Sequence, residues 1–253
     1  MTRLLATPAL ALGLARPAAL PAAAFDMTAL AQAERAALRA EVKAYLLENP
    51  EVMLEVFKVL EDRQAEAETV KDEQMLAENA DALFQSPTDW VGGNPQGDIT
   101  LVEFLDYRCG YCRKAYSEVE ELVKSDGNIR FIVKEFPILG EESLLSSQFA
   151  IATRLVAGDE AYKKAHDALI ALRGDATRES LGALAGDLGL DGAAILAKMD
   201  SPEVKAVIEA NHALGTAMQI NGTPSFVIEG SMLRGYVPLD GMQQIVAAER
   251  AKG

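Results

Sequence analysis

The sequence has only two cysteines, two histidines and one tryptophan in 253 residues. A structural zinc site needs four ligands, usually supplied by two pairs of Cys or His side chains. No second cysteine pair exists, and His166 and His212 fall in separate predicted helices without ligand-like spacing. Two cysteines are also too few for a disulfide scaffold. We therefore expect no metal site and no cofactor.

Long hydrophobic runs are also missing, since no stretch after the N-terminus approaches the roughly 18 apolar residues of a membrane span. Positive charge is scarce, with 24 Lys and Arg against 38 Asp and Glu and a net charge of −14. This balance argues against nucleic acid and anionic membranes as partners. Arg3, the apolar stretch 4–14 and the small residues 22–24 are typical of an export signal. We predict a signal peptide over residues 1–24 and a periplasmic mature chain.

Glycine is absent from residues 26–86, where Pro50 is the only proline. Apolar residues recur at helical spacing on both sides of Asn49-Pro50, which favours a helix end and a new helix start there. Such narrow apolar stripes cannot form a core alone. We predict an N-terminal helical arm with its linker (residues 25–86) that self-associates through residues 28–60. The alternatives are a hairpin docked on the main domain and a mobile charged helix.

The two cysteines that are present stand close together, in Cys109-Gly110-Tyr111-Cys112. A β-branched run over 99–105 predicts a buried strand before them, and helical spacing over 115–123 predicts a helix after them. The pair therefore lies at a helix N-terminus, where backbone N–H groups and the helix dipole stabilise a thiolate. A purely structural disulfide is disfavoured, because closing a four-residue loop gains little entropy. The motif predicts a thiol–disulfide oxidoreductase.

The rest of the chain predicts a mixed α/β domain. Turn-forming residues over 86–97 follow the N-terminal arm, with a short edge strand predicted at 88–91 and a second strong strand at 129–136. Five helices are predicted between residues 141 and 218. A hairpin over 225–234 and a helix over 239–251 complete the order β-β-α-β, helical block, β-β-α.

Three motifs carry a resemblance to a known family: Val102–Arg108 leading into the cysteines, Lys134–Gly140, and Gly222–Phe226. With them the chain resembles the DsbA family of thioredoxin-fold proteins over roughly residues 88–250. Within that family it is most similar to the ScsC-like (suppressor of copper sensitivity C) and 27-kDa outer-membrane-protein-like members, which share an arm resembling residues 45–52. The resemblance implies an α/β thioredoxin fold over residues 87–253, with an inserted helical domain (about 141–218) and a preceding N-terminal α-helical arm.

The resemblance also assigns roles around the dithiol. Cys109, first in the helix and more exposed, is expected to attack a substrate disulfide, and the more buried Cys112 to resolve the mixed disulfide. Gly110 and Tyr111 are expected to tune the reduction potential. Arg108 either favours the Cys109 thiolate or is simply solvated.

Four further site residues follow from the family pattern. Pro224 resembles the family's cis-proline facing the dithiol, and Thr223 before it would offer backbone groups to an extended substrate segment. Glu103 corresponds to a buried acid that exchanges protons with Cys112, and Lys134 is expected to be its partner. The alternative is that Glu103 points to solvent from one face of the strand.

We expect a protein disulfide isomerase or reductase that acts as a homo-oligomer, with a trimer implied by the resemblance. Its clients would be unfolded or misdisulfided exported proteins, and a membrane reductase of the DsbD or ScsB type would keep it reduced. One alternative is a monomeric dithiol oxidase that is recharged by a quinone-linked membrane partner. A non-enzymatic alternative is a periplasmic copper-binding or holdase protein that uses the two thiolates as soft Cu(I) ligands.

Overall fold

The computed structural model describes residues 31–252. The predicted signal peptide therefore lies outside the described residues. By its internal contacts the chain divides into two units, with the boundary between Glu61 and Asp62. The two units are described separately below.

The first unit is helical. It contains α1 (Gln32–Glu48) and the beginning of α2 (Glu51–Glu78). The helix break predicted at Asn49-Pro50 is confirmed, and the Asn49 side-chain amide donates to the Tyr45 carbonyl across the end of α1 (2.9 Å). α1 buries no residue. The large apolar side chains exposed in this unit are Val42, Tyr45, Leu47, Met53, Leu54, Val56, Phe57, Val59 and Leu60.

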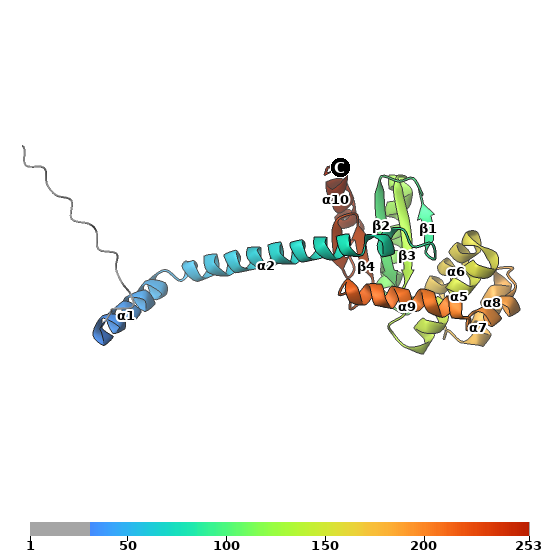
Figure 1. Cartoon of the computed structure of the whole chain (residues 1–253), viewed down its shortest axis with the longest axis horizontal. Helices are drawn as coiled ribbons and strands as arrows, with labels where there is room; N and C mark the ends of the chain where they lie inside the picture. The colour runs from blue at the N-terminus through green and yellow to red at the C-terminus, as the bar shows by residue number, and fades with distance from the viewer. Residues whose placement is uncertain (1–30, 253) are drawn as a thin grey trace, which may run out of the picture. The chain divides into compact units, whose positions relative to one another are not determined.

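The second unit is built on a five-stranded sheet in the order β1-β3-β2-β4-β5 (Figure 1). The strands are β1 (Trp90–Gly93), β2 (Ile99–Leu105), β3 (Ile129–Glu135), β4 (Ser225–Ile228) and β5 (Ser231–Arg234). β2 and β3 are parallel, and the other neighbouring pairs are antiparallel. β1 is an edge strand, and all five strands lie within one or two residues of their predicted positions.

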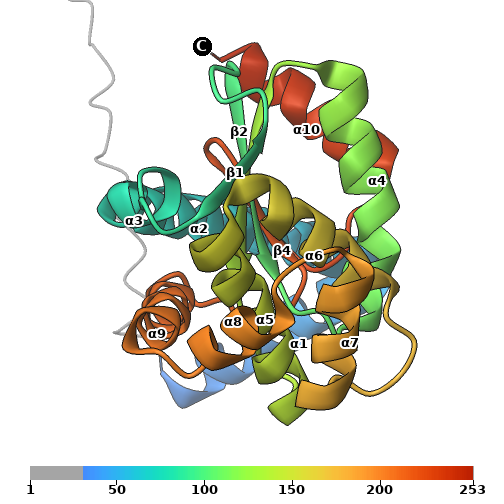
Figure 2. The same ribbon diagram turned by 90° about the vertical axis from the view of Figure 1, so that its right-hand side faces the viewer.

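One face of the sheet is covered by α4 (Gly110–Asp126) and α10 (Leu239–Arg250), which lie side by side in Figure 2. The connection between β3 and β4 holds the five predicted helices α5 (Glu141–Ala157), α6 (Asp159–Ala171), α7 (Arg178–Asp187), α8 (Gly192–Lys198) and α9 (Pro202–Ala217). Figure 1 shows α5–α8 grouped beside the sheet and α9 returning toward β4. This is the predicted thioredoxin fold with an inserted helical domain.

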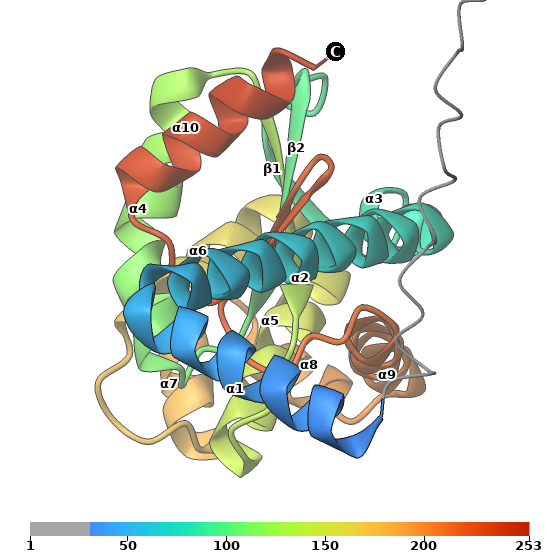
Figure 3. The ribbon, with the colours of Figure 1, turned by 90° about the vertical axis from the view of Figure 1, so that its left-hand side faces the viewer.

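The other face of the sheet is covered by α9, by the end of α2 and by α3 (Ala80–Phe84), as Figure 3 shows for α2 and α3. Met75, Leu76 and Leu83 are buried there against strand residues such as Phe104. Polar contacts add to this packing. The Lys71 ammonium donates to the Gln219 side-chain oxygen (2.6 Å), and Asp72 forms a bidentate ion pair with the Arg234 guanidinium on β5 (2.7 Å for each bond). Residues 62–86 therefore pack as part of the second unit, whereas the sequence places the domain start at residue 87.

Candidate active site

The turn between β2 and α4 places Cys109 at the helix N-cap, with extended backbone angles (φ −73°, ψ 120°), and α4 begins at Gly110. The turn is held locally. The Cys109 N–H donates to the Asp106 carbonyl (3.1 Å), and the Asp106 carboxylate accepts from the Arg108 N–H (2.8 Å). Cys109 retains 8% exposure and Cys112 none. Cys109 is thus the more exposed and Cys112 the more buried of the two, as predicted.

The two thiols have opposite acid–base properties. A hydrogen bond from the Cys112 thiol, followed by the Thr223 side chain and the backbone N–H groups of Cys112 and Tyr111, lowers the pKa of Cys109 to about 5. The same thiol–thiol hydrogen bond and burial raise the pKa of Cys112 well above its usual value. At neutral pH, Cys109 is therefore a thiolate and Cys112 its hydrogen-bond donor.

The Thr223–Pro224 peptide bond is cis, as the family resemblance implies. The Thr223 carbonyl lies 3.1 Å from Cys109 Sγ. The segment is fixed on both sides, because the Ser225 hydroxyl donates to Gly222 O (2.8 Å) and the Gly235 N–H donates to Pro224 O (3.0 Å). Residues 114 positions apart in the chain thus meet at the nucleophilic sulfur.

Glu103 is buried at 3% exposure, so the alternative in which it faces solvent is wrong. Burial, followed by the charges of Glu120, Glu135 and Cys109, raises its pKa to about 8. Its Oε1 atom has no hydrogen-bond partner. The charge of Glu103 in turn raises the pKa of Cys112, so the two groups affect each other's protonation.

The predicted pairing of Glu103 with Lys134 is wrong. In the parallel β2–β3 ladder Lys134 is the register partner of Phe104, whereas Glu103 is opposite Val133, so Lys134 lies on the other face of the sheet. There the Lys134 ammonium forms a buried ion pair with Asp89 and donates to the Ala82 carbonyl. Both partners precede β2 in the chain, and the structure does not bring Lys134 to the dithiol.

The Arg108 side chain is partly exposed, and its guanidinium is bound by groups other than the sulfur. Its guanidinium forms an ion pair with Glu142 (2.9 Å) and donates to the Gly174 carbonyl (3.0 Å), which ties the catalytic turn to the inserted helices. Tyr111 is 62% exposed and stacks on Tyr236 with ring centroids 6.2 Å apart. A Cβ at Gly110 would meet no atom within 4 Å, so this position next to the sulfur is open.

Two buried acids near the site were not singled out from the sequence. Asp106 accepts from the N–H groups of Ile138 (2.8 Å) and Leu139 (3.1 Å) as well as from Arg108, and so joins the turn to the loop after β3. Glu135 lies on β3, 3% exposed, and accepts hydrogen bonds from two tyrosines. The sequence could have indicated Glu135, because it is an acid within an apolar strand, the same pattern that singled out Glu103.

The described part of the chain contains no group of three or more His, Cys, Asp or Glu side chains that could hold a metal ion. None of the helices between residues 31 and 252 combines the length and apolar character of a membrane span.

A thioredoxin-type sheet, a dithiol at a helix N-terminus and a cis-proline beside it together define a thiol–disulfide oxidoreductase. The sequence model described as "DSBA-like thioredoxin domain" matches residues 100–247, and the chain belongs to this family. A second model, "Copper resistance protein ScsC N-terminal domain", matches residues 34–67. The predicted similarity to ScsC-like members of the DsbA family is thereby confirmed.

Two solved structures illustrate the relationship. A thioredoxin-like oxidoreductase from Silicibacter pomeroyi DSS-3 is 41% identical, with a TM-score of 0.63, over 68% of this chain and 97% of that one. BcfH from Salmonella enterica Typhimurium is 27% identical, with a TM-score of 0.71, over 87% of this chain and 97% of that one. The second comparison extends beyond the catalytic domain.

A curated Na(+)/H(+) antiporter NhaA from Herminiimonas arsenicoxydans is 28% identical over 163 residues, which are 64% of this chain and 26% of the antiporter. The chain spans about a quarter of the length of the curated relatives that it matches.

Proposed function

We propose that the chain is a periplasmic oxidoreductase that exchanges disulfides in exported proteins, acting as an oligomeric isomerase or reductase. The observation that carries this proposal is the pairing of a stabilised Cys109 thiolate with an enclosed, protonated Cys112 beside Thr223. A thiolate of low pKa at a helix N-terminus is the reactive form in disulfide exchange. The periplasmic location rests on the predicted signal peptide and on the family.

In the first step, the Cys109 thiolate attacks one sulfur of a client disulfide. The client S–S bond breaks, a mixed disulfide between Cys109 and the client forms, and the second client sulfur leaves as a thiolate. The cis-Thr223–Pro224 segment lies beside the attacking sulfur. An extended client segment pairing with the backbone of Thr223 would present its disulfide to Cys109.

In the reductive branch, Cys112 attacks the Cys109 sulfur of the mixed disulfide. Its thiol proton goes to Glu103, the client's bound sulfur leaves as a thiolate, and a Cys109–Cys112 disulfide forms. Two electrons pass from the dithiol to the client. Glu103 suits this role because its pKa of about 8 lets it accept and return a proton near neutral pH.

In the isomerase branch, another client thiolate attacks the mixed disulfide instead. Cys109 is then released as a thiolate, a different client disulfide forms, and no net electrons are transferred. This branch requires the dithiol to be reduced, which is the task proposed for a membrane reductase. A monomeric oxidase would instead start from the Cys109–Cys112 disulfide.

The exposed apolar side chains of the first unit support the oligomeric part of the proposal. Leu47 and Leu54 are more than two-thirds exposed (72% and 71%), and α1 has no buried residue. Many large apolar side chains exposed within one short segment commonly mark an interface. Association of copies would place several dithiols around one client and raise their effective concentration.

The test is reactivation of a scrambled-disulfide protein by the mature chain and by a chain lacking residues 25–61. Both proteins are also examined by analytical ultracentrifugation and by a dithiol oxidation assay. We expect the mature chain to be oligomeric and to reactivate the test protein, and the shortened chain to be monomeric with lost reactivation. Dithiol oxidation without reactivation by either protein would refute the isomerase and favour the oxidase.

A further inference from the structure

We propose that Glu135 is a positioning residue that sets the protonation of Glu103 and thereby the pH at which Cys112 resolves a mixed disulfide. The inference rests on the proposed function. It assigns a role to a buried carboxyl group that the exchange steps above do not use.

The sheet register places the two carboxyl groups together. Glu103 is opposite Val133 and Glu135 is opposite Leu105 in the parallel β2–β3 ladder. Because side chains alternate along a strand, Glu103 and Glu135 are diagonal neighbours on the same face of the sheet. Both are 3% exposed, so little water screens their charges from each other.

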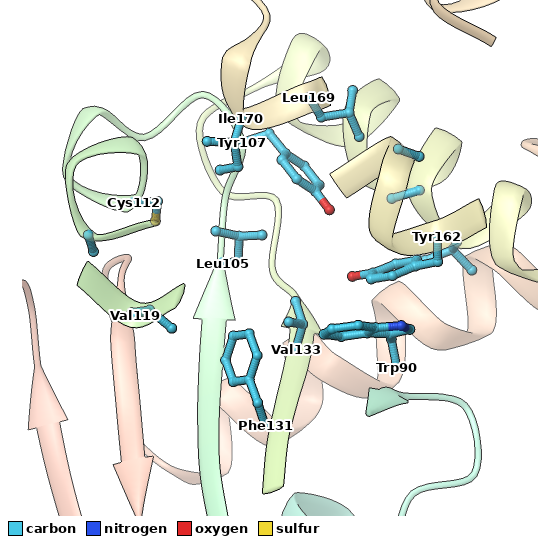
Figure 4. Close-up of a cluster of buried hydrophobic side chains, with 14 of the residues drawn as sticks. Trp90, Leu105, Tyr107, Cys112, Val119, Phe131, Val133, Tyr162, Leu169 and Ile170 are labelled. Carbon is cyan, nitrogen blue, oxygen red and sulfur yellow. The ribbon is translucent and has the colours of Figure 1, made fainter. Parts of the chain in front are cut away.

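A hydrogen-bond network fixes the Glu135 carboxylate. Tyr107 Oη donates to Glu135 Oε1 (2.8 Å), and Tyr162 Oη donates to the same oxygen (2.6 Å). Figure 4 shows the hydroxyl ends of these two tyrosines pointing into the same space beside Val133. Tyr107 Oη also lies 3.0 Å from His166 Nδ1, so the network joins the catalytic turn, β3 and α6.

The surroundings of Glu135 supply few balancing charges. The polar and charged groups around it, beyond the two tyrosines, are Asp89, Asp106, Ser147, Arg154, His166 and Asn211. Arg154 is engaged elsewhere, with Asp159 (2.6 Å) and the Thr88 carbonyl (2.6 Å). Burial lowers the pKa of His166 to about 4, so His166 is neutral at pH 7.

The charge on Glu135 is therefore stabilised mainly by the hydrogen bonds from the two tyrosine hydroxyls. Burial raises its pKa to about 7, and the hydrogen bonds from Tyr162 and Tyr107 oppose that rise. Near neutral pH, Glu135 is therefore partly ionised.

The charge on Glu135 acts on Glu103. Glu103 is faced by Glu120 and Cys112 from α4, by Cys109 at the helix N-cap and by Glu135 from β3, and each of these groups repels the Glu103 charge when it is ionised. An ionised Glu135 raises the pKa of Glu103, after burial and alongside Glu120. Neutralising Glu135 should therefore let Glu103 ionise, and accept the Cys112 proton, at lower pH.

The experiment follows the reaction of the reduced full-length mature chain with Ellman's reagent in a stopped-flow instrument. The first release of thionitrobenzoate reports attack by Cys109, and the second reports displacement by Cys112. Four proteins are compared over a range of pH: wild type, E135Q, E103Q and E103Q/E135Q. Gln at position 135 keeps an oxygen that both tyrosines can donate to.

We expect the second phase of the wild type to have an inflection near pH 8, corresponding to Glu103. E135Q should move that inflection down by roughly one unit, E103Q should remove it, and the double variant should match E103Q. The first phase should keep its pH dependence in all four proteins. If E135Q acted only through the structure, its effect would persist in the E103Q background, and that result would overturn the inference. An E135Q inflection at the same pH as in wild type would also overturn it.

Y162F serves as a second variant, because it removes one donor while leaving the carboxyl group in place. Losing that donor makes Glu135 harder to ionise, so the Glu103 inflection should again move to lower pH. Carboxyl-carbon NMR titration of labelled glutamate, with E103Q for assignment, reads Glu103 without any exchange chemistry. If the wild type gives no second release, the proposed function fails, and the NMR titration of E135Q still decides whether the two carboxyl groups are coupled.

Discussion

At the scale of single residues, the two cysteines differ because one donates the hydrogen bond that the other accepts. The Cys112 thiol is the leading cause of the low pKa of Cys109, ahead of the Thr223 side chain and the backbone N–H groups. The helix N-terminus alone would therefore leave Cys109 less acidic. The second cysteine has a role before it ever resolves a mixed disulfide.

Replacing Cys112 with a residue that cannot donate should raise the pKa of Cys109. In C112A we expect the thiolate absorbance of the reduced protein to titrate at least about one unit above pH 5. C112S is the matched control, because its hydroxyl still donates and should retain part of the shift. A C112A titration that still centres near pH 5 would contradict this explanation.

The low pKa of Cys109 also predicts how the stability of the reduced protein depends on pH. The folded value of about 5 lies below the unfolded value, so the thiolate contributes stability that is fully present above about pH 8.5. That contribution is lost as the pH falls through 5. In urea unfolding under reducing conditions, the free energy of unfolding of wild type relative to C109S should increase by on the order of 2 kcal/mol between pH 5 and pH 7. A pH-independent difference would contradict it.

Arg108 adjoins the nucleophile in sequence, but its guanidinium is held by Glu142 and the Gly174 carbonyl. We therefore expect R108A to leave the Cys109 titration near pH 5 and to lower stability by about 1 kcal/mol or less, since the ion pair is partly exposed. R108K, which keeps the charge, serves as the control. A marked rise in the Cys109 pKa in R108A alone would show that the guanidinium acts on the sulfur.

At the scale of elements, the face of the sheet on which a side chain lies determines its role. Lys134 and Glu103 are both buried on neighbouring strands, but they lie on opposite faces, and Lys134 pairs with Asp89 before β1. Removing one partner of a buried ion pair leaves an uncompensated charge. We therefore expect Lys134 to contribute to the stability of the fold and not to the reaction of the dithiol.

K134M should lower the free energy of unfolding by about 3–5 kcal/mol. The pH dependence of both phases with Ellman's reagent should stay as in wild type, because Lys134 lies away from the dithiol. K134M/D89N should recover part of the loss, since the unpaired carboxylate is gone. If K134M instead altered the second phase without loss of stability, Lys134 would belong to the reaction.

The elements were predictable from the sequence because local signals define them. Asn49-Pro50 marks a helix boundary, Gly127 adopts the left-handed conformation at the end of α4 (φ 72°), and the apolar runs over 99–105 and 129–136 give buried strands. The dithiol was predictable for the same reason. The pairing of Lys134 was not, because strand register depends on tertiary packing that one sequence does not reveal.

At the scale of the whole molecule, the catalytic domain begins earlier than its family motifs indicate. After Leu60, fewer apolar residues recur at helical spacing in α2, so the sequence predicts that residues 62–86 continue the arm and lead into the linker. Their contacts form with β-strand and α9 residues far along the chain, such as Phe104 and Leu214. Helical periodicity cannot predict such partners, and only the fold shows that this stretch completes the core.

Two truncated chains distinguish a domain start at residue 62 from a start at residue 87. A chain starting at residue 62 keeps Met75, Leu76 and Leu83 in the core and should unfold cooperatively, with a Cys109 titration near pH 5. A chain starting at residue 87 loses all three side chains and exposes the apolar face around Phe104. Because each buried Leu or Met contributes about 2–5 kcal/mol, this loss is comparable with the whole stability of a domain.

Thermal unfolding followed by circular dichroism, together with dye binding to exposed apolar surface, distinguishes the two truncations. The chain starting at 62 should show one sharp transition and little dye binding, whereas the chain starting at 87 should show a broad transition or none and strong dye binding. Mutating Met75 and Leu76 to Ala in the longer chain is the control, since it removes apolar contacts while keeping the backbone of α2. If the chain starting at 87 were as stable as the one starting at 62, residues 62–86 would be dispensable to the core, and the domain would begin where the sequence predicts.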